Sequence, residues 1–199
     1  MTNDGLAPGS DGLLRCAWGT STPDYAVYHD TEWGRPLHGD VALFERLTLE
    51  AFQSGLSWLT ILRKREGFRR AFAGFDPGTV AGFGASEVAR LLADVAIVRN
   101  RTKIAAAIAN ARALVALQER DGPDALDRMV WAHAPAAQPA PRASADVPAV
   151  TPESTALAKA LKRAGFVFVG PTTAYATMQA CGLVDDHLAR CAFRAALRR

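Results

Sequence analysis

Apolar residues recur at helical spacing along most of this sequence, and this period constrains the fold more than any other feature. In the longest such stretch, Ile104, Ile108, Ala111 and Val115 fall on one face of an α-helix. Only residues 166–169, Phe-Val-Phe-Val, have the composition of a strand, and this run is too short to found a sheet. The sequence therefore predicts an all-α fold with short turns.

Residues that cap or stop helices set the expected boundaries. Asp and Ser or Thr side chains are typical N-caps, because their oxygens can accept hydrogen bonds from the first helical turn. The candidate caps are Asp40, Ser57, Asp76 and Thr151. Glycines and prolines mark the ends. We expect helices over residues 40–54, 57–74, 87–94, 101–121, 152–165, 171–182 and 186–198, with another beginning at Asp76-Pro77.

Two segments lack this helical pattern. Residues 1–12 contain mainly Gly, Asp, Ser and Pro, which predicts a disordered leader, and residues 134–150 are mostly Pro, Ala and Ser, which predicts a long connection. No apolar run approaches the roughly 20 residues that a membrane helix needs, and no secretory signal is visible. We therefore expect a cytoplasmic protein without a membrane partner.

The net charge of +3 over 199 residues is unevenly distributed. Residues 61–70 hold five basic side chains and one acidic one, and Arg99, Arg101 and Lys103 follow one another without an acid. Such clusters are typical of a localised phosphate-binding face. From charge alone, solvated helix faces explain them equally well.

Two cysteines and two histidines form a possible metal site. His187 and Cys191 have the spacing of neighbours on one helix face, and Cys16 and His29 lie near the N-terminus. Together they could complete the tetrahedral shell of a structural zinc ion and connect the two ends of the chain. The alternative is that the cysteines are simply buried, as we expect for Cys181 in its apolar helix.

Aromatic residues are concentrated in a polar segment near the N-terminus. Their rings suit stacking on a flat ligand such as a nucleobase, although a small core under a loop would need the same residue types. These residues are Trp18, Tyr25, Tyr28 and Trp33, and Trp58 follows further along the chain.

Glu50 lies on an otherwise apolar stripe of the helix expected over residues 40–54. A carboxylate is costly to bury unless it has a partner or a task. The partner could be Arg46, one helical turn earlier, and the task could be recognition of a ligand.

Residues 91–104 predict a short helix, a tight turn and the start of a long helix. A hairpin between two helices can direct backbone N–H groups and a positive helix N-terminus at a phosphate. Many helical bundles contain such a hairpin, so it does not identify a function alone.

Longer motifs that contain these residues resemble those of a known family. They are Arg15-Cys16-x-Trp18, Tyr28-His29-Asp30-x-Glu32-Trp33-Gly34, Glu50-x-x-Gln53-x-Gly55-Leu56-Ser57-Trp58, Ile97-Val98-Arg99-Asn100-Arg101-x-Lys103-Ile104, Phe168-Val169-Gly170-x-Thr172 and Met178-Gln179-Ala180-Cys181-Gly182-x-Val184-x-Asp186-His187. In this order and spacing, from about Arg15 to Cys191, the chain resembles the 3-methyladenine DNA glycosylase I family.

The resemblance implies the helix-hairpin-helix DNA glycosylase fold, with a structural zinc ion, the zinc snap, joining the N- and C-terminal segments. The implied ligands are Cys16, His29, His187 and Cys191. We then expect a zinc-containing lobe formed by residues 13–39 and 151–199. A helix-hairpin-helix lobe would span residues 40–133, with the connection over 134–150.

The resemblance also assigns roles in a base pocket and at the DNA. Glu50 would face the exocyclic amine and ring nitrogens of a flipped base, Tyr28 would hydrogen-bond the base, and Trp58 would stack on it. The remaining wall residues would be Trp18, Tyr25 and Trp33. The implied DNA contacts are Leu56, which would fill the gap in the duplex, and Ala96, Ile97, Arg99, Arg101 and Lys103 of the hairpin.

The implied activity is that of a base-excision-repair glycosylase. It would hydrolytically release 3-methyladenine from alkylated double-stranded DNA and leave an abasic site. No lyase step is expected, because no lysine is assigned to the pocket, and the enzyme is expected to act as a monomer. The alternative is a zinc-stabilised module that binds DNA damage without catalysis.

Three positions depart from the residues usual in the family. Ala96 replaces a hairpin Gly, and an Ala would cost roughly 1 kcal/mol if the turn needs φ > 0 there. Ala51 replaces a Gly beside Glu50, which would narrow the pocket. Asp185 stands where Asn is typical and would add a charge beside the metal.

Overall fold

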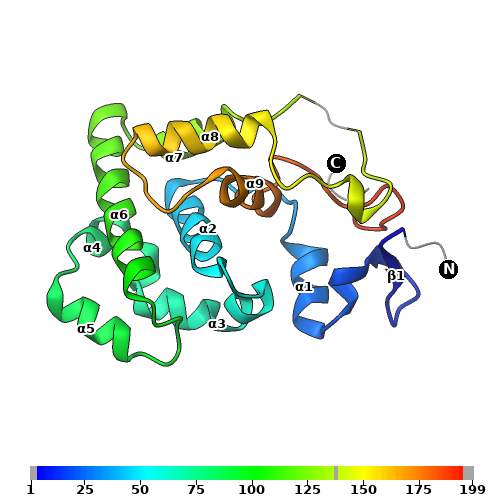
Figure 1. The fold of residues 1–199 in the computed structure, drawn as a ribbon, viewed down its shortest axis with the longest axis horizontal. Helices are drawn as coiled ribbons and strands as arrows, with labels where there is room; N and C mark the ends of the chain where they lie inside the picture. Colours follow the sequence, from blue (N-terminus) through cyan, green and yellow to red (C-terminus); the bar gives the residue numbers. More distant parts are fainter. Residues whose placement is uncertain (1–3, 137–138, 195–199) are drawn as a thin grey trace.

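A computed structural model describes residues 4–136 and 139–194, and helices form most of this part of the chain (Figure 1). The prediction of a helical protein is confirmed, apart from one short pair of strands. No described helix is both long and apolar enough to cross a bilayer. The helices are α1 (Pro23–Thr31), α2 (Asp40–Gln53), α3 (Trp58–Ala71), α4 (Pro77–Ala81), α5 (Ala85–Ala93), α6 (Arg101–Asp121), α7 (Ala125–Trp131), α8 (Pro152–Arg163) and α9 (Pro171–Ala180).

Side-chain caps begin four helices close to the predicted positions. Ser57, Asp76, Asn100 and Thr151 precede α3, α4, α6 and α8. Each accepts a hydrogen bond from the backbone N–H three residues later, at 2.8–3.3 Å. These bonds join residues close in the chain, so the local pattern is enough to place the helix starts.

Asp40 is the first residue of α2 rather than its cap, because Gly39 holds the capping position. One carboxylate oxygen of Asp40 accepts a hydrogen bond from the Asp127 N–H at 2.9 Å, and the other accepts one from Gln118 Nε2 at 2.7 Å. The side chain therefore connects α2 to α6 and α7.

The first helix, α1, lies in a segment that the sequence pattern describes only as polar and rich in turns. Thr22 caps it by accepting a hydrogen bond from the Tyr25 N–H at 3.2 Å, and Pro23 occupies its first position. Only Tyr28 and His29 are buried along it, so no apolar period reveals the helix. The Thr-Pro pair is the signal that could have located it.

The predicted disordered leader is wrong for the described residues 4–12, and residues 1–3 lie outside the described part. Strand β1 (Leu6–Pro8) pairs antiparallel with β2 (Leu14–Cys16). Asp11 stabilises the turn between the strands: its carboxylate accepts hydrogen bonds from the Leu13 N–H at 3.1 Å and from both terminal nitrogens of Arg15 at 2.7 Å. The polar composition of residues 4–12 therefore reflects a charged turn of a hairpin rather than disorder.

The predicted helix over residues 186–198 is wrong as far as residue 194, because residues 186–194 form short turns and irregular segments rather than an α-helix. Residues 195–198 lie outside the described part. The Leu188 N–H donates to Cys16 Sγ at 3.4 Å. Arg194 donates to the carbonyls of Asp185 at 2.6 Å and His187 at 2.5 Å. These tertiary bonds satisfy groups that a helix would have paired with one another.

The strand-like run 166–169 forms no strand. Phe168 has a φ of +61°, which interrupts an extended conformation. The neighbouring Val167 exchanges two hydrogen bonds with the Asn110 side chain on α6, at 2.7 Å and 3.1 Å. The segment is therefore a fixed loop that leads into α9.

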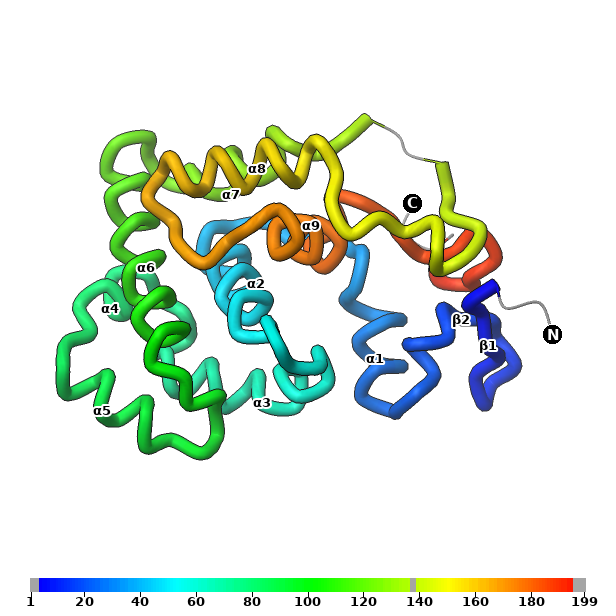
Figure 2. The backbone as a smooth tube through the Cα atoms, in the orientation of Figure 1, coloured from blue at the N-terminus to red at the C-terminus, as the bar shows by residue number. Residues whose placement is uncertain are grey.

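The main hydrophobic cluster extends from Leu43 on α2 to Val184 after α9, so α8 and α9 pack on the same core as α2 and α6. A second cluster contains Cys16, Leu188 and Cys191. Figure 2 shows that the N-terminal hairpin and the red C-terminal segment lie together at one end of the molecule. The boundary between the clusters therefore falls after residue 184 rather than at 151.

Candidate functional site

A cavity of about 380 Å³ opens among α1, α2, the start of α3 and α9. Five aromatic side chains and one acidic side chain that the sequence singles out all line it. The cavity is therefore apolar and flat-walled with a carboxylate, which suits a planar ligand with hydrogen-bonding edges. These lining residues are Trp18, Tyr25, Tyr28, Trp33, Glu50 and Trp58.

The aromatic rings hold one another in fixed orientations. Trp18 packs edge to face on Tyr25 and Trp33, with ring centroids 5.5 Å and 5.0 Å apart, and Tyr28 lies 5.4 Å from Trp58. The Tyr25 hydroxyl oxygen accepts a hydrogen bond from the Leu59 N–H in the first turn of α3, at 2.9 Å. Its own proton is therefore free to serve a bound ligand.

Glu50 is 6% exposed, and its burial raises the pKa of the carboxyl from 4.5 to about 7, although nearby Arg46 acts in the opposite direction. Within the described residues no side chain donates a hydrogen bond to Glu50. Arg46 is not its ion-pair partner, since its guanidinium instead reaches Glu32 at 3.6 Å. The carboxylate thus faces the cavity without a hydrogen-bond or ion-pair partner in the described part of the chain.

Other polar residues in the cavity lining were not assigned roles from the sequence. Gln53, Gln179 and Asp186 all belong to the recognised motifs, which is the signal that could have found them. Ser144 and Val147 come from the Pro- and Ala-rich connection. No local pattern marks these two, because only the folded chain brings that connection to the cavity.

Asp186 is a second buried carboxylate in the cavity lining. One of its oxygens accepts hydrogen bonds from the Tyr175 hydroxyl at 2.6 Å and from Gln179 Nε2 at 2.8 Å. Two side chains of α9 therefore hold Asp186 in place, whereas no described side chain donates a hydrogen bond to Glu50.

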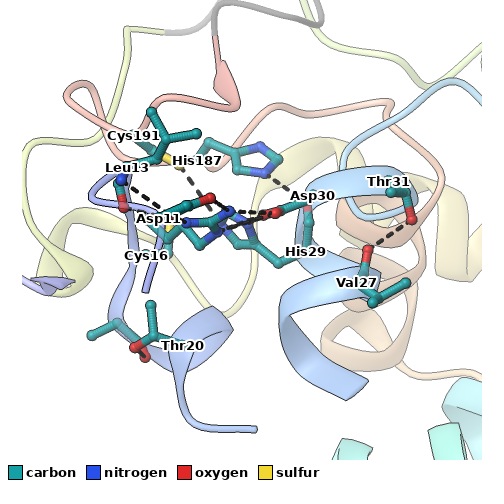
Figure 3. A network of polar contacts seen from close by, with 12 residues as sticks. Asp11, Leu13, Cys16, Thr20, Val27, His29, Asp30, Thr31, His187 and Cys191 are labelled. Atoms are coloured by element: carbon teal, nitrogen blue, oxygen red, sulfur yellow. Dashed lines mark hydrogen bonds and ion pairs between the residues drawn. The ribbon is translucent and has the colours of Figure 1, made fainter. Parts of the chain in front are cut away.

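The ligand atoms of Cys16, His29 and Cys191 lie within 4.8 Å of one another, and all three residues are buried. Figure 3 shows His187 beside them, with its ring centroid 4.7 Å from that of His29. Hydrogen bonding from Cys16 lowers the pKa of the Cys191 thiol, which favours the thiolate that binds metals. Two thiols and one imidazole, with a second imidazole adjoining, could hold a zinc ion.

Carboxylates orient both histidines. Asp30 contacts His29 Nδ1 at 2.8 Å, and Asp185 contacts His187 Nδ1 at 3.0 Å. In His29 this leaves Nε2, which lies 3.6 Å from Cys191 Sγ, as the nitrogen available to a metal, an arrangement common around metal-binding histidines. Nε2 of His187 lies 3.4 Å from the His29 carbonyl oxygen. Asp185, the residue that departs from the family pattern, therefore has a positioning contact.

The hairpin over residues 94–100 packs on α3. The Asp94 carboxylate accepts a hydrogen bond from the Ala96 N–H at 2.8 Å, and Lys64 of α3 donates to the Val95 carbonyl at 2.7 Å. Ala96 is not among the residues with positive φ, so the expected strain does not arise. A Cβ built on Gly67 would lie 2.9 Å from the Cβ of Ala96. The missing side chain at Gly67 therefore makes room for Ala96.

The predicted DNA contacts separate into exposed and buried residues. Arg99, Arg101 and Leu56 are exposed. Ile97 and Lys103 are buried and Ala96 is half-buried, so the DNA contacts expected of these three residues remain predictions. Lys103 Nζ donates to the carbonyls of residues 52 and 54, at 2.8 Å and 2.6 Å, because these groups at the end of α2 lack helical partners.

The family model for methyladenine glycosylase matches residues 18–195 of this chain. DNA-3-methyladenine glycosylase 1 of Escherichia coli (strain K12) is 47% identical over 182 residues, which cover 90% of this chain and 96% of that protein. A crystal structure of 3-methyladenine DNA glycosylase I has a TM-score of 0.84 at 46% identity, covering 89% of this chain and 98% of the other. A tyrosine-to-phenylalanine variant of such an enzyme, in complex with 3-methyladenine, has a TM-score of 0.82 at 36% identity and covers 90% and 97%.

Proposed function

The chain belongs to the methyladenine glycosylase family, and we propose that it hydrolytically excises 3-methyladenine from alkylated double-stranded DNA. The products are the free base and an abasic site. The observation that carries this proposal is Glu50, a buried carboxylate in an aromatic cavity to which no described side chain donates a hydrogen bond. A neutral ligand would not compensate the cost of burying the Glu50 charge, whereas an alkylated, cationic base would.

The chemistry of the substrate explains why a carboxylate is useful here. Methylation at N3 gives the nucleoside a positive charge and makes the base a good leaving group. A flipped base would stack among Tyr28, Trp58 and the neighbouring rings, with its amine and ring nitrogens near Glu50. In a cavity walled largely by aromatic rings, the carboxylate stabilises positive charge more strongly than it could in solvent. Glu50 thus favours the alkylated base over neutral adenine.

The reaction is proposed to stop at hydrolysis. A lyase step needs an amine nucleophile in the pocket, and no lysine lines the cavity within the described residues. The buried Lys103 belongs to one of the sequence motifs, but its amine donates hydrogen bonds to two backbone carbonyls.

We assign the DNA backbone contact to the hairpin and the start of α6. This region forms the helix-hairpin-helix element, in which exposed Arg99 and Arg101 meet phosphates beside a helix N-terminus. Leu56 is 42% exposed on a turn where Gly55 has a φ of +79°, and it would fill the space that the flipped base leaves in the duplex. One protein molecule is expected to act on one damaged site.

A structural zinc ion is proposed to bind Cys16, His29, His187 and Cys191. The donor set fits zinc, and a carboxylate orients each histidine. Cys16, His29 and Cys191, whose ligand atoms lie closest together, are all buried. When bound, zinc supplies a cross-link between the terminal segments rather than chemistry at the base. Residues 157–184 of the expected zinc-containing lobe contribute to the main hydrophobic cluster, so the cross-link is proposed to join the N-terminal segment only to the segment after residue 184.

The proposal is tested by incubating the protein with methylated duplex DNA and measuring released 3-methyladenine and abasic sites. Release by the wild type and its loss in Glu50→Gln, in a protein that remains folded, are expected. Glu45→Gln is the matched control, because Glu45 lies on the same helix but pairs with Arg69 at 2.8 Å outside the cavity. DNA binding without release of base would instead support a non-catalytic damage-binding module.

A further inference from the structure

Arg46 is a buried cation directly beneath the cavity. It lies on α2 one turn before Glu50 and is 8% exposed. Its guanidinium carbon lies 5.6 Å from the centre of the Tyr28 ring and 5.8 Å from that of Trp58. A buried charge is costly unless its contacts compensate, so these contacts need an explanation.

The only ion-pair partner of Arg46 in the described residues is Glu32, and this carboxylate is shared. Arg65 of α3 holds Glu32 through two hydrogen bonds, at 2.5 Å and 2.9 Å, whereas Arg46 lies 3.6 Å away. The closer partner dominates the neutralisation of Glu32. The charge of Arg46 therefore remains available to act on the cavity.

Arg46 also fixes the hydrogen-bonding direction of the Tyr28 hydroxyl. Its Nη1 donates to Tyr28 Oη at 3.3 Å. A guanidinium can only donate, so the hydroxyl oxygen must accept, and its own proton must point to another acceptor. No hydrogen bond joins Tyr28 to Glu50 in the described part of the chain. The remaining direction for this proton is into the cavity that Tyr28 lines.

We propose that Arg46 is a positioning residue that sets the hydrogen-bond polarity of the base pocket, with Tyr28 as donor and Glu50 as acceptor. This inference rests on the proposed function, because it concerns recognition of the same base. Tyr28 then donates to an unsubstituted ring nitrogen, and Glu50 accepts from the exocyclic amine. A purine with an amine at one edge and a free ring nitrogen nearby matches this polarity.

The charges around Glu50 support the second half of the proposal. Burial raises the pKa of Glu50 to about 7, and Arg46 is the cation that opposes this rise. The other groups that face this region are Tyr28 and Glu32 from α1 and its end, Cys181 at the end of α9, and Asp186 in the cavity lining. None of these is a cation, so Arg46 alone favours the ionised acceptor.

A double-mutant cycle tests the link to Tyr28. Binding of free 3-methyladenine is measured by calorimetry for the wild type, Arg46→Met, Tyr28→Phe and the double variant, at a pH well above the Glu50 pKa. Met fills the volume of Arg without a charge or donor. We expect each single change to weaken binding about tenfold, and the double variant to be little weaker than either. Independent effects that multiply would overturn the proposal.

The pH dependence of binding tests the link to Glu50. In Arg46→Met, the lower-pH limit of binding should move upward by about one pH unit or more, because the cation that favours ionised Glu50 is gone. Arg46→Lys keeps the charge and should restore the wild-type limit. Glu50→Gln, measured in parallel, reports any titration of the ligand itself.

Arg69→Met is the matched structural control, since Arg69 is a cation of the neighbouring α3 that pairs with Glu45 and Glu66 and is absent from the cavity lining. It should lower the melting temperature while leaving affinity and pH dependence unchanged. If Arg46→Met does not fold, Arg46→Lys still tests the proposal through the cycle, because it retains the charge without the planar donor pair. A wild-type pH limit in a folded Arg46→Met protein, together with independent effects of the Arg46 and Tyr28 changes on binding, would refute the role of Arg46. Failure of the wild type to bind or release the base would refute the proposed function instead.

Discussion

At the scale of single residues, the pocket retains a carboxylate that destabilises the free protein. Glu50 is buried without a hydrogen-bond donor from the described side chains, so its charge is compensated only by Arg46 nearby and by whatever enters the cavity. A site that is built for a cationic ligand in this way is selective at the expense of the stability of the free protein. The free energy of unfolding should therefore depend on the ionisation of this one residue.

We predict that Glu50→Gln stabilises the protein at neutral and alkaline pH while it abolishes excision. The pKa of Glu50 rises from 4.5 to about 7 on folding, so its favourable contribution is complete below pH 4.5 and is lost as the pH rises through 7. Gln has no charge to bury. The difference in melting temperature between variant and wild type should therefore grow from about pH 5 to about pH 8. A difference that is constant with pH would contradict this account.

At the scale of elements, the contact between α3 and the hairpin shows how one departure is accommodated. Ala96 stands in a turn where the family usually has Gly, and it would destabilise the turn if a positive φ were needed there. In the structure the turn does not use positive φ at this position, and the added methyl group lies against Gly67. The space for the side chain was thus supplied by the neighbouring helix.

We predict that Gly67→Ala destabilises the protein by about 1–3 kcal/mol. Helix propensity alone would favour Ala by about 1 kcal/mol, but the new Cβ would lie 2.5 Å from the Ala96 carbonyl oxygen. Gly78→Ala in α4 is the control, since its Cβ would meet only Asp76 at 3.7 Å. Denaturant unfolding of both variants measures the difference, and equal stabilisation of the two would show that the hairpin does not restrict position 67.

The end of α2 and the start of α6 are connected by Lys103, and this contact gives a second prediction at the same scale. Lys103→Met should lower stability by about 1–3 kcal/mol, because it leaves the carbonyls of Phe52 and Ser54 without their donor. The salt dependence of DNA binding should stay unchanged. By contrast, Arg101→Ala should reduce the slope of log binding constant against log salt concentration by about 1, as expected for a lost phosphate contact. An equal reduction in Lys103→Met would place that lysine at the DNA.

At the scale of the whole molecule, the first and last parts of the described chain meet at one small cluster. The Ala192 N–H donates to the Leu14 carbonyl at 2.9 Å, and Cys16 and Cys191 share the second hydrophobic cluster. The cavity lies against this region, since Cys16 and Leu188 also contribute to its lining. A metal that fixes the termini would therefore also fix one wall of the base pocket.

We predict about one zinc ion per chain and a lower melting temperature after chelation, because a metal that binds only the native state stabilises it. Cys191→Ser should lose zinc, whereas Cys181→Ala should retain it, since Cys181 lies outside the cluster. Elemental analysis and thermal unfolding of the three proteins provide the measurement. A native protein that contains no zinc and is unaffected by chelation would exclude the zinc snap.

The sequence by itself determined the helical class, the helix starts at Ser57, Asp76, Asn100 and Thr151, and the membership of the aromatic pocket. Caps act over three residues, and the motifs preserve the order of the pocket residues, so both can be seen without a structure. The tertiary structure alone decided the rest. It paired the polar N-terminal segment as a hairpin, replaced the expected last helix by turns through residue 194, and buried Lys103 against carbonyls. It also placed Arg46 between Glu32 and Tyr28 rather than on Glu50. These outcomes depend on partners that are distant in the chain, and no local pattern records which distant group will satisfy a given charge or backbone group.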